Sequence, residues 1–150
     1  MKRFLAIAFA FSALTSTFWS AAASLQVHDA WIREAPPTAS VLAGYMVIRN
    51  AGTTPAEITN ISSPDFGHSE MHRTVVENGV ASMVPIGKLE IPPGEQITLE
   101  PGGTHLMLID PRHPLRAGDT VTLTFHDAAG HASTFSVPVM RETGEVGHHH

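Results

Sequence analysis

The stretch Ser-Glu-Met-His-Arg-Thr-Val-Val-Glu-Asn-Gly-Val-Ala-Ser-Met-Val-Pro, residues 69–85, carries the strongest fold signal of the chain. Asn78-Gly79 lies between two runs that are rich in β-forming residues. Both central residues of a type I′ turn need a positive φ, and Asn-Gly is the pair that most favours this turn. We therefore expect a β-hairpin closed by a two-residue loop.

The register of this hairpin decides which side chains lie together. If Glu77 pairs with Val80, Thr74 stands opposite Met83, and His72 shares their face because alternate residues of a strand point the same way. His72 and Met83 would then be diagonal neighbours, with Cβ atoms about 7–8 Å apart or less. A loop of two or four residues preserves this arrangement, whereas a three-residue loop would place one of the two on the other face.

Strand-like segments recur along the rest of the chain between Gly, Pro, Asn and Asp turns, and Val121–Phe125 alternates apolar and polar residues as a half-buried strand does. The candidate strands are 25–32, 44–50, 57–62, 69–76, 80–85, 88–91, 96–100, 105–109, 120–126 and 132–139. Short strands at such even spacing favour an all-β sandwich or barrel. The aromatic residues expected in its core are Trp31, Tyr45, Phe125 and Phe135.

The composition limits the possible functions. The 150 residues suffice for one domain, and 43% hydrophobic with 15% charged residues is typical of a globular protein. A net charge of −5 without a block of like charge argues against nucleic acid or anionic lipid as a partner. The absence of cysteine excludes disulfides, thiolate metal sites and blue-copper electron transfer. Histidine and methionine remain as soft or borderline metal ligands.

The first 23 residues have the order of a secretory signal peptide, with basic Lys2 and Arg3, an apolar run, and small residues at 21–23. A membrane anchor is the alternative, but the run is short for a bilayer span and ends in small residues. We expect export to the periplasm and cleavage after residue 23, with no stable membrane insertion afterwards. The domain would comprise residues 24–150, of which 144–150 form a flexible tail.

The segment His105-Leu106-Met107 indicates a metal site. On a strand, His105 and Met107 face one way while Leu106 faces the other, so an imidazole and a thioether lie side by side. With His72 and Met83, this makes two His/Met pairs. Soft, neutral thioethers select copper(I) over calcium, magnesium or zinc. Each of these residues alone is more simply explained as core filler or a surface group, so the inference depends on their combination.

The spacing of these residues resembles a known motif. Ten residues separate His72 from Met83, twenty-one separate Met83 from His105, and one separates His105 from Met107. This pattern resembles the H(M)-x10-M-x21-H-x-M motif of the PCuAC family of periplasmic copper chaperones. Further similar stretches extend the resemblance from Val27 to Val139: Asp29–Arg33 with Pro36-Pro37, Ala43–Met46 with Asn50–Gly52, Ile91–Gly94, Leu99–Gly103 and Pro114–Thr120.

The resemblance implies an all-β, cupredoxin-like Greek-key β-sandwich that is not an enzyme. It implies that one Cu(I) ion is bound near the surface by His72, Met83, His105 and Met107. It also implies delivery of this copper for assembly of the copper-A centre of cytochrome c oxidase, either to an oxidase subunit or to a Sco-type copper protein. Thr74 and Ala81 stand where the family often has Met. We expect a monomer with a thinner methionine-rich entry path.

One alternative function stays open, because copper buffering or resistance without a dedicated oxidase recipient needs the same site. The other histidines are more simply explained as surface groups. His126 and His131 flank a turn and, with Asp127, could weakly hold copper(II), although solvated loop residues are the simpler interpretation. His148-His149-His150 fit a copper(II)-binding tail and a remnant of a purification tag equally well.

Overall fold

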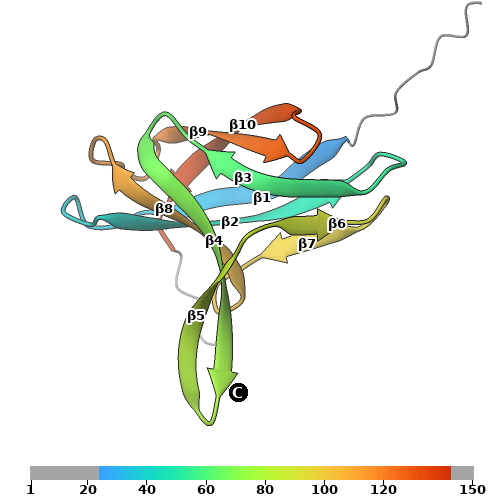
Figure 1. Ribbon diagram of the computed structural model, residues 1–150. Helices are drawn as coiled ribbons and strands as arrows, with labels where there is room; N and C mark the ends of the chain where they lie inside the picture. Colours follow the sequence, from blue (N-terminus) through green and yellow to red (C-terminus); the bar gives the residue numbers. More distant parts are fainter. Residues whose placement is uncertain (1–23, 143–150) are drawn as a thin grey trace, which may run out of the picture.

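The strands follow the turn signals of the sequence closely. The computed structural model describes residues 24–142, and over this range the chain forms strands and turns without a helix (Figure 1). The strands are β1 (Leu25–Arg33), β2 (Val41–Asn50), β3 (Ala56–Ser62), β4 (Phe66–Glu77), β5 (Val80–Ile86), β6 (Leu89–Ile91), β7 (Gln96–Leu99), β8 (Thr104–Pro111), β9 (Thr120–Asp127) and β10 (Ala132–Met140). The expected signal peptide and the tail from residue 144 lie outside the described residues.

Two layers make up the domain. In the first, the strand order is β5-β4-β8-β2-β1, and β7 pairs with β2 beyond the end of β8. In the second, the order is β10-β9-β3-β6. A short parallel pairing of β1 with β10, at Ile32 and Val139, joins the layers. The predicted all-β, cupredoxin-like sandwich is confirmed. Within the described residues, no helix is long and apolar enough to span a membrane.

The core lies between the layers and is built by alternation along each strand. On β8, Leu106 and Leu108 are fully buried, on the face opposite His105 and Met107, and Met71 on β4 is buried beside them. Phe66, at the start of β4, is among the largest buried side chains. The sequence had predicted a start of this strand three residues later, at Ser69. Removing these apolar surfaces from water is the main contribution to folding.

The prediction for the core aromatics was partly wrong. Phe125 is buried and meets the edge of half-buried Phe135 at a centroid distance of 5.2 Å. Tyr45 is buried as well, at 5% exposed, but it packs against half-buried Trp31, 4.9 Å between centroids, and neither belongs to the main apolar cluster. Tyr45 is two residues from Ala43, whose partner on β8 is Met107, so it lies on the outer face of the first sheet. Periodicity shows that two residues share a face, but not which face is covered.

The hairpin of β4 and β5 extends from the body of the sandwich (Figure 1). Asn78 and Gly79 have φ values of 52° and 77°, as a type I′ turn requires. Glu77 pairs with Val80, and Thr74 with Met83, so the predicted register is confirmed. β4 is the longest strand, with 12 residues, because its first half pairs with β8 in the body while its second half forms the hairpin.

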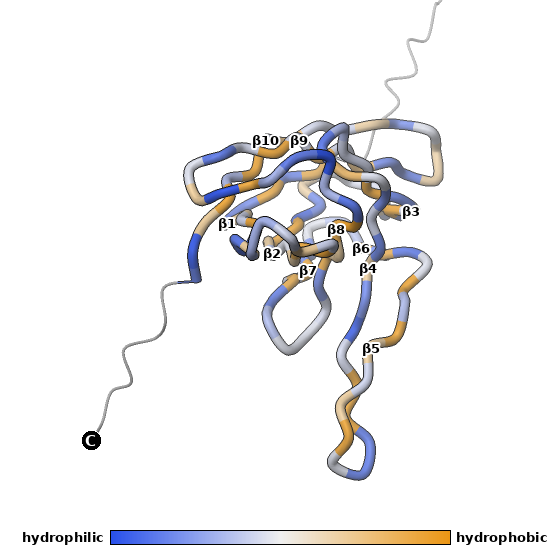
Figure 2. Tube along the Cα trace, turned by 90° about the vertical axis from the view of Figure 1, so that its left-hand side faces the viewer, coloured by the Kyte–Doolittle hydropathy of each residue, from blue (hydrophilic) through white to orange (hydrophobic). Residues whose placement is uncertain are grey.

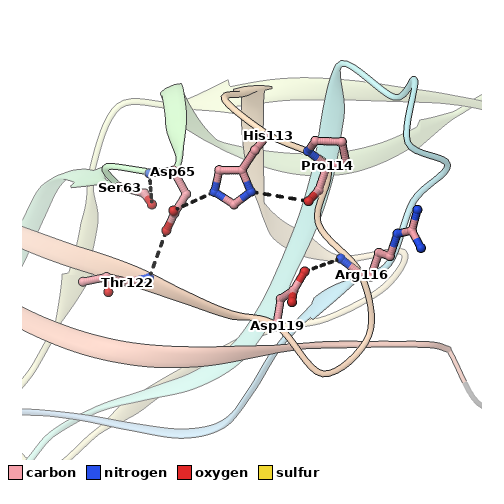
Figure 3. Close-up of polar contacts among 7 residues, drawn as sticks. All are labelled: Ser63, Asp65, His113, Pro114, Arg116, Asp119 and Thr122. Carbon is pink, nitrogen blue, oxygen red and sulfur yellow. Dashed lines mark hydrogen bonds and ion pairs between the residues drawn. The ribbon is translucent and has the colours of Figure 1, made fainter.

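A polar cluster connects the β3–β4 turn to the segment between β8 and β9 (Figure 3). His113 Nε2 lies 3.2 Å from Asp65 Oδ1, and Thr122 N–H donates to Asp65 Oδ2. The hydrogen bond that His113 donates to Asp65, with a smaller effect of the Pro114 carbonyl, raises the pKa of His113 above its ordinary value of 6.5. The protonated imidazolium is therefore the form that stabilises this connection.

His113→Ala should destabilise the protein more at pH 5.5 than at pH 8. Because folding raises the pKa of His113, its contribution is fully present below the unfolded-state value and is lost as the pH rises through the folded-state value. Urea denaturation of the wild type and the variant at both pH values measures this difference. His28→Ala, at an exposed position of β1, is the control for the loss of an imidazole as such. An equal loss at both pH values would contradict the assignment.

Candidate metal centre

The pairing of β4 with β8 forms the site. Directly opposite residues of an antiparallel pair share a face, and here His72 stands opposite His105 while Glu70 stands opposite Met107. The hairpin register adds Met83, opposite Thr74, to the same face. All predicted ligands therefore lie on the outer face of the first sheet, on the adjacent strands β5, β4 and β8.

A depression of about 330 Å³ lies on this face. Three predicted ligands, Met83, His105 and Met107, line it, together with Thr74, Tyr45 and Arg33. His72 does not line the depression but lies directly beside it. Its ring centroid is 6.2 Å from that of His105, and the two rings are inclined at 38°.

This separation of the two rings suits a shared metal ion. With metal–nitrogen bonds of about 2.0–2.1 Å, the centroids of two imidazoles on one ion lie roughly 5 to 6.4 Å apart. The centroid distance of 6.2 Å between His72 and His105 falls near the upper end of that range. The upper end corresponds to a nearly linear pair of ligands, whereas a tetrahedral angle gives about 5.2 Å, so a four-ligand site would need the two rings to move about 1 Å closer.

His105 is fixed by the turn that precedes β8. Its side chain is buried, and its Nδ1 lies 3.0 Å from the carbonyl oxygen of Gly103. A carbonyl can only accept, so Nδ1–H is the donor. The lone pair of the neutral ring is then on Nε2, the nitrogen farther from the backbone. Such a hydrogen bond on the opposite nitrogen is typical of a metal-binding histidine.

His72 presents the opposite nitrogen. Its Nε2 lies 2.7 Å from Glu70 Oε2, and an ionised carboxylate only accepts, so Nε2–H is the donor. His72 Nδ1 is buried without a hydrogen-bond partner. A buried nitrogen without a partner is costly unless another group or an ion engages it. This nitrogen is therefore the available donor atom of His72.

The two thioethers differ in exposure. Met83 is 59% exposed on the edge strand β5, whereas Met107 is half-buried on β8 beside β4 and β2. Thr74 shares their face and lines the depression, and Ala81 lies two residues from Met83 on the same face. One soft ligand is thus held by the body of the domain, and the other is open to solvent.

Other side chains, which were not predicted from the sequence to belong to the site, surround the candidate ligands. Arg33 lies 5.2 Å from the centroid of the Tyr45 ring and binds Glu142 at 2.8 Å. Burial raises the pKa of the Tyr45 phenol, and the nearby Arg33 charge partly opposes this shift. Glu70 was also overlooked. It lies two residues before His72, so the strand period that paired His105 with Met107 could have placed it on the ligand face.

The remaining histidines of the described range form no second centre. His68 is exposed with Nε2 3.8 Å from Glu70, and His126 Nε2 engages Ser62 Oγ. His131 Nδ1 binds Asp127. Burial acts to raise the pKa of Asp127, but the backbone and side-chain hydrogen bonds from His131 together lower it below its ordinary value. Across residues 24–142, no three His, Asp or Glu side chains are placed to hold a metal ion together.

Comparison with known proteins identifies the family. The family model described as "Putative lipoprotein LpqE-like" matches residues 25–139. The chain belongs to the LpqE-like family. A relative from Leifsonia xyli subsp. xyli, "Putative lipoprotein Lxx21020", is 31% identical over 121 residues, which are 80% of this chain and 72% of the relative.

Solved structures similar in fold to this LpqE-like protein include PCuAC domains, which agrees with the resemblance noted in the sequence. The copper-bound PCuAC domain from PmoF2 has a TM-score of 0.66 and 20% identity, covering 80% of this chain and 96% of that domain. The solution structure of CuI-DR1885 from Deinococcus radiodurans has a TM-score of 0.62 and 24% identity, covering 83% of each chain. At these identities the likeness establishes the fold.

The neutral rings of His72 and His105 in this LpqE-like protein should be opposite tautomers. His105 should carry its hydrogen on Nδ1 because of the Gly103 carbonyl, and His72 on Nε2 because of Glu70. Long-range ¹H–¹⁵N NMR of the metal-free protein distinguishes the two. Glu70→Ala should change the tautomer balance of His72 alone, whereas Glu70→Gln keeps an acceptor oxygen and should preserve it. The same tautomer in both rings would contradict the assigned hydrogen bonds.

Proposed function

We propose that this protein is an exported copper(I) chaperone that binds one Cu(I) ion through His72, Met83, His105 and Met107. The observation that carries the proposal is the convergence of two imidazoles and two thioethers on one sheet face, through the registers of β4 with β8 and of β4 with β5. The ion is cargo, and its binding and release involve no change in oxidation state.

The chemistry of the donor set supports copper(I). Two thioether sulfurs are soft and uncharged, so they favour Cu(I) over the hard cations and over zinc. The partnerless Nδ1 of His72 and the free Nε2 of His105 supply borderline donors. Proteins of similar fold also support copper(I), since the PmoF2 domain is copper-bound and DR1885 is in a Cu(I) form. A neutral, partly exposed site of this kind suits ligand exchange better than permanent retention.

Export and a non-enzymatic role belong to the same proposal. The order of residues 1–23 is that of a signal peptide, and the matching family and the Leifsonia relative are both named as lipoproteins. In an oxidising periplasm, methionine and histidine can hold copper(I) where cysteine thiols would be consumed as disulfides. The chain without its first 23 residues would act as a monomer that binds and transfers copper, with no turnover.

Copper(I) binding is the first test. The wild type should bind one Cu(I) ion by native mass spectrometry, and Met83→Ala/Met107→Ala should weaken binding by at least about 100-fold, the upper end of what losing an outer-shell partner costs a metal site. Competition with bathocuproine disulfonate measures the affinity. Met140→Ala, which removes an exposed methionine from β10, is the matched control and should bind as the wild type does. An unchanged affinity of the double variant would reject these ligands.

The recipient of the copper is the second test. We propose delivery for the copper-A centre of cytochrome c oxidase, to the oxidase subunit or through a Sco-type protein. Deleting the gene should then lower the copper content and activity of the oxidase under copper limitation. Expressing the wild-type gene in the deletion strain should restore both, whereas expressing the Met83→Ala/Met107→Ala variant should not. Normal oxidase in the deletion strain, together with copper sensitivity, would favour the alternative of copper buffering or resistance.

A further inference from the structure

The outer edge of β5 is free. β5 ends the strand order of the first sheet, and within residues 24–142 no strand pairs with its outer side. In a hairpin with a two-residue loop, the residues that flank the loop, here Glu77 and Val80, form a hydrogen-bonded pair. Along the strands from there, hydrogen-bonded pairs alternate with pairs whose backbone N–H and C=O groups point away from each other. The backbone of Ala81, Met83 and Pro85 therefore points away from β4. The Thr74 N–H, opposite Met83, accordingly turns away from β5 and donates to Gly103.

This edge lacks the charged residues that usually protect against pairing. Exposed edge strands generally carry charged residues, often lysine, that discourage the addition of another strand. The sequence of β5, Val-Ala-Ser-Met-Val-Pro-Ile, has no charged residue. Val80, Met83 and Val84 are 67%, 59% and 46% exposed. Figure 2 shows hydrophobic segments along the extended hairpin and a hydrophilic tip.

We propose that the outer edge of β5 is the docking edge for the copper-accepting partner, which adds an extended, uncharged strand antiparallel to β5. This inference rests on the proposed function and names how the partner reaches the same site. The partner strand would bond to both the N–H and the C=O of Ala81 and of Met83. Pro85, which has no N–H, offers only its carbonyl and limits the paired length.

The register places the partner beside the ion. A residue directly opposite Met83 would form a hydrogen-bonded pair, with Cα atoms about 5.5 Å apart and side chains on one face. That face is the one with His72, His105 and Met107. A soft side chain on the partner strand could then bind the Cu(I) ion as the Met83 sulfur dissociates. Copper stays in the same oxidation state, and one ligand bond forms as another breaks.

The size and charge of the edge favour a transient partner over a second copy of this chain. Stable interfaces use about 20–30 residues on each side, whereas β5 has seven residues and extends from the body. The uncharged edge of β5 is complementary to an uncharged partner strand. A charged partner strand would lose its hydration on docking and would find no opposite charge on β5. Two residues that offer both backbone groups provide a small docking energy, as a partner that must leave after transfer requires.

Ala81→Pro tests this docking. Proline at position 81 removes an N–H that points outward, so no β4–β5 hydrogen bond is lost, and the φ that it fixes is tolerated at edge strands, as at Pro85. Ala81→Val, which keeps that N–H, is the matched control. The Cu(I)-loaded proteins are mixed with the metal-free copper-A domain of oxidase subunit II, the two proteins are separated at timed intervals, and their copper is measured. Release to bathocuproine disulfonate, which needs no docking edge, is followed in parallel. Circular dichroism checks that each variant folds.

We expect Ala81→Pro to slow transfer to the copper-A domain by about tenfold, the equivalent of one lost hydrogen bond, while release to the chelator stays within about twofold of the wild type. Ala81→Val should transfer normally. Two results would overturn the docking edge but leave the proposed function intact. Either Ala81→Pro transfers copper to the copper-A domain at the wild-type rate, or it slows transfer to the domain and release to the chelator equally. A wild type that supplies the chelator but never the domain would overturn the oxidase recipient as well. Concentration-dependent dimerisation that Ala81→Pro abolishes would identify a second copy as the occupant instead.

Discussion

The antiparallel pairing of β4 with β8 is the constraint on which the candidate site depends. It sets His72 opposite His105 and Glu70 opposite Met107, and it brings the hairpin, with Met83, to the same face. The pairing is held by the inward side chains of the same strands, Met71, Leu106 and Leu108, which are buried in the core. Because the two faces of a strand are related by a period of two, a slip of one residue would bury the ligands and expose the core. The hydrophobic effect therefore also maintains the register of the ligands.

The site combines a fixed half with an open half. His105 is buried and bound to the Gly103 carbonyl, and Met107 lies within the sheet, so these donors are positioned before any ion arrives. Met83 lies on a solvent-exposed edge strand with few neighbours to restrain it. The two histidines offer opposite nitrogens, because a carbonyl fixes one ring and a carboxylate fixes the other. In the proposed site, the Cu(I) ion would therefore be bound by ligands of the domain body and would stay accessible to a partner from the side of the hairpin.

The local predictions succeeded where the signal was short-range. Asn78-Gly79 set the turn and hence the register from Glu77 to His72, and each strand was found within about three residues of its observed ends. They failed where a face had to be assigned. Trp31 was expected in the core, yet it is only half-buried and packs with the buried Tyr45 on the outer face beside the candidate site. Strand alternation is symmetric between the two faces, and only packing against the second layer breaks that symmetry.

By itself, the sequence determined the hairpin, the sharing of a face by His105 and Met107, the lack of thiol chemistry and the resemblance to the PCuAC motif. These follow from turn chemistry, strand period, composition and motif spacing, all of which are local or linear properties. Only the tertiary structure decided that β8 lies beside β4, that Glu70 binds His72 Nε2 and leaves Nδ1 free, and that β5 ends the sheet with an open, uncharged edge. Strand order and the contacts across it depend on how distant segments bury their apolar faces together, and this has no counterpart in the neighbours along the chain.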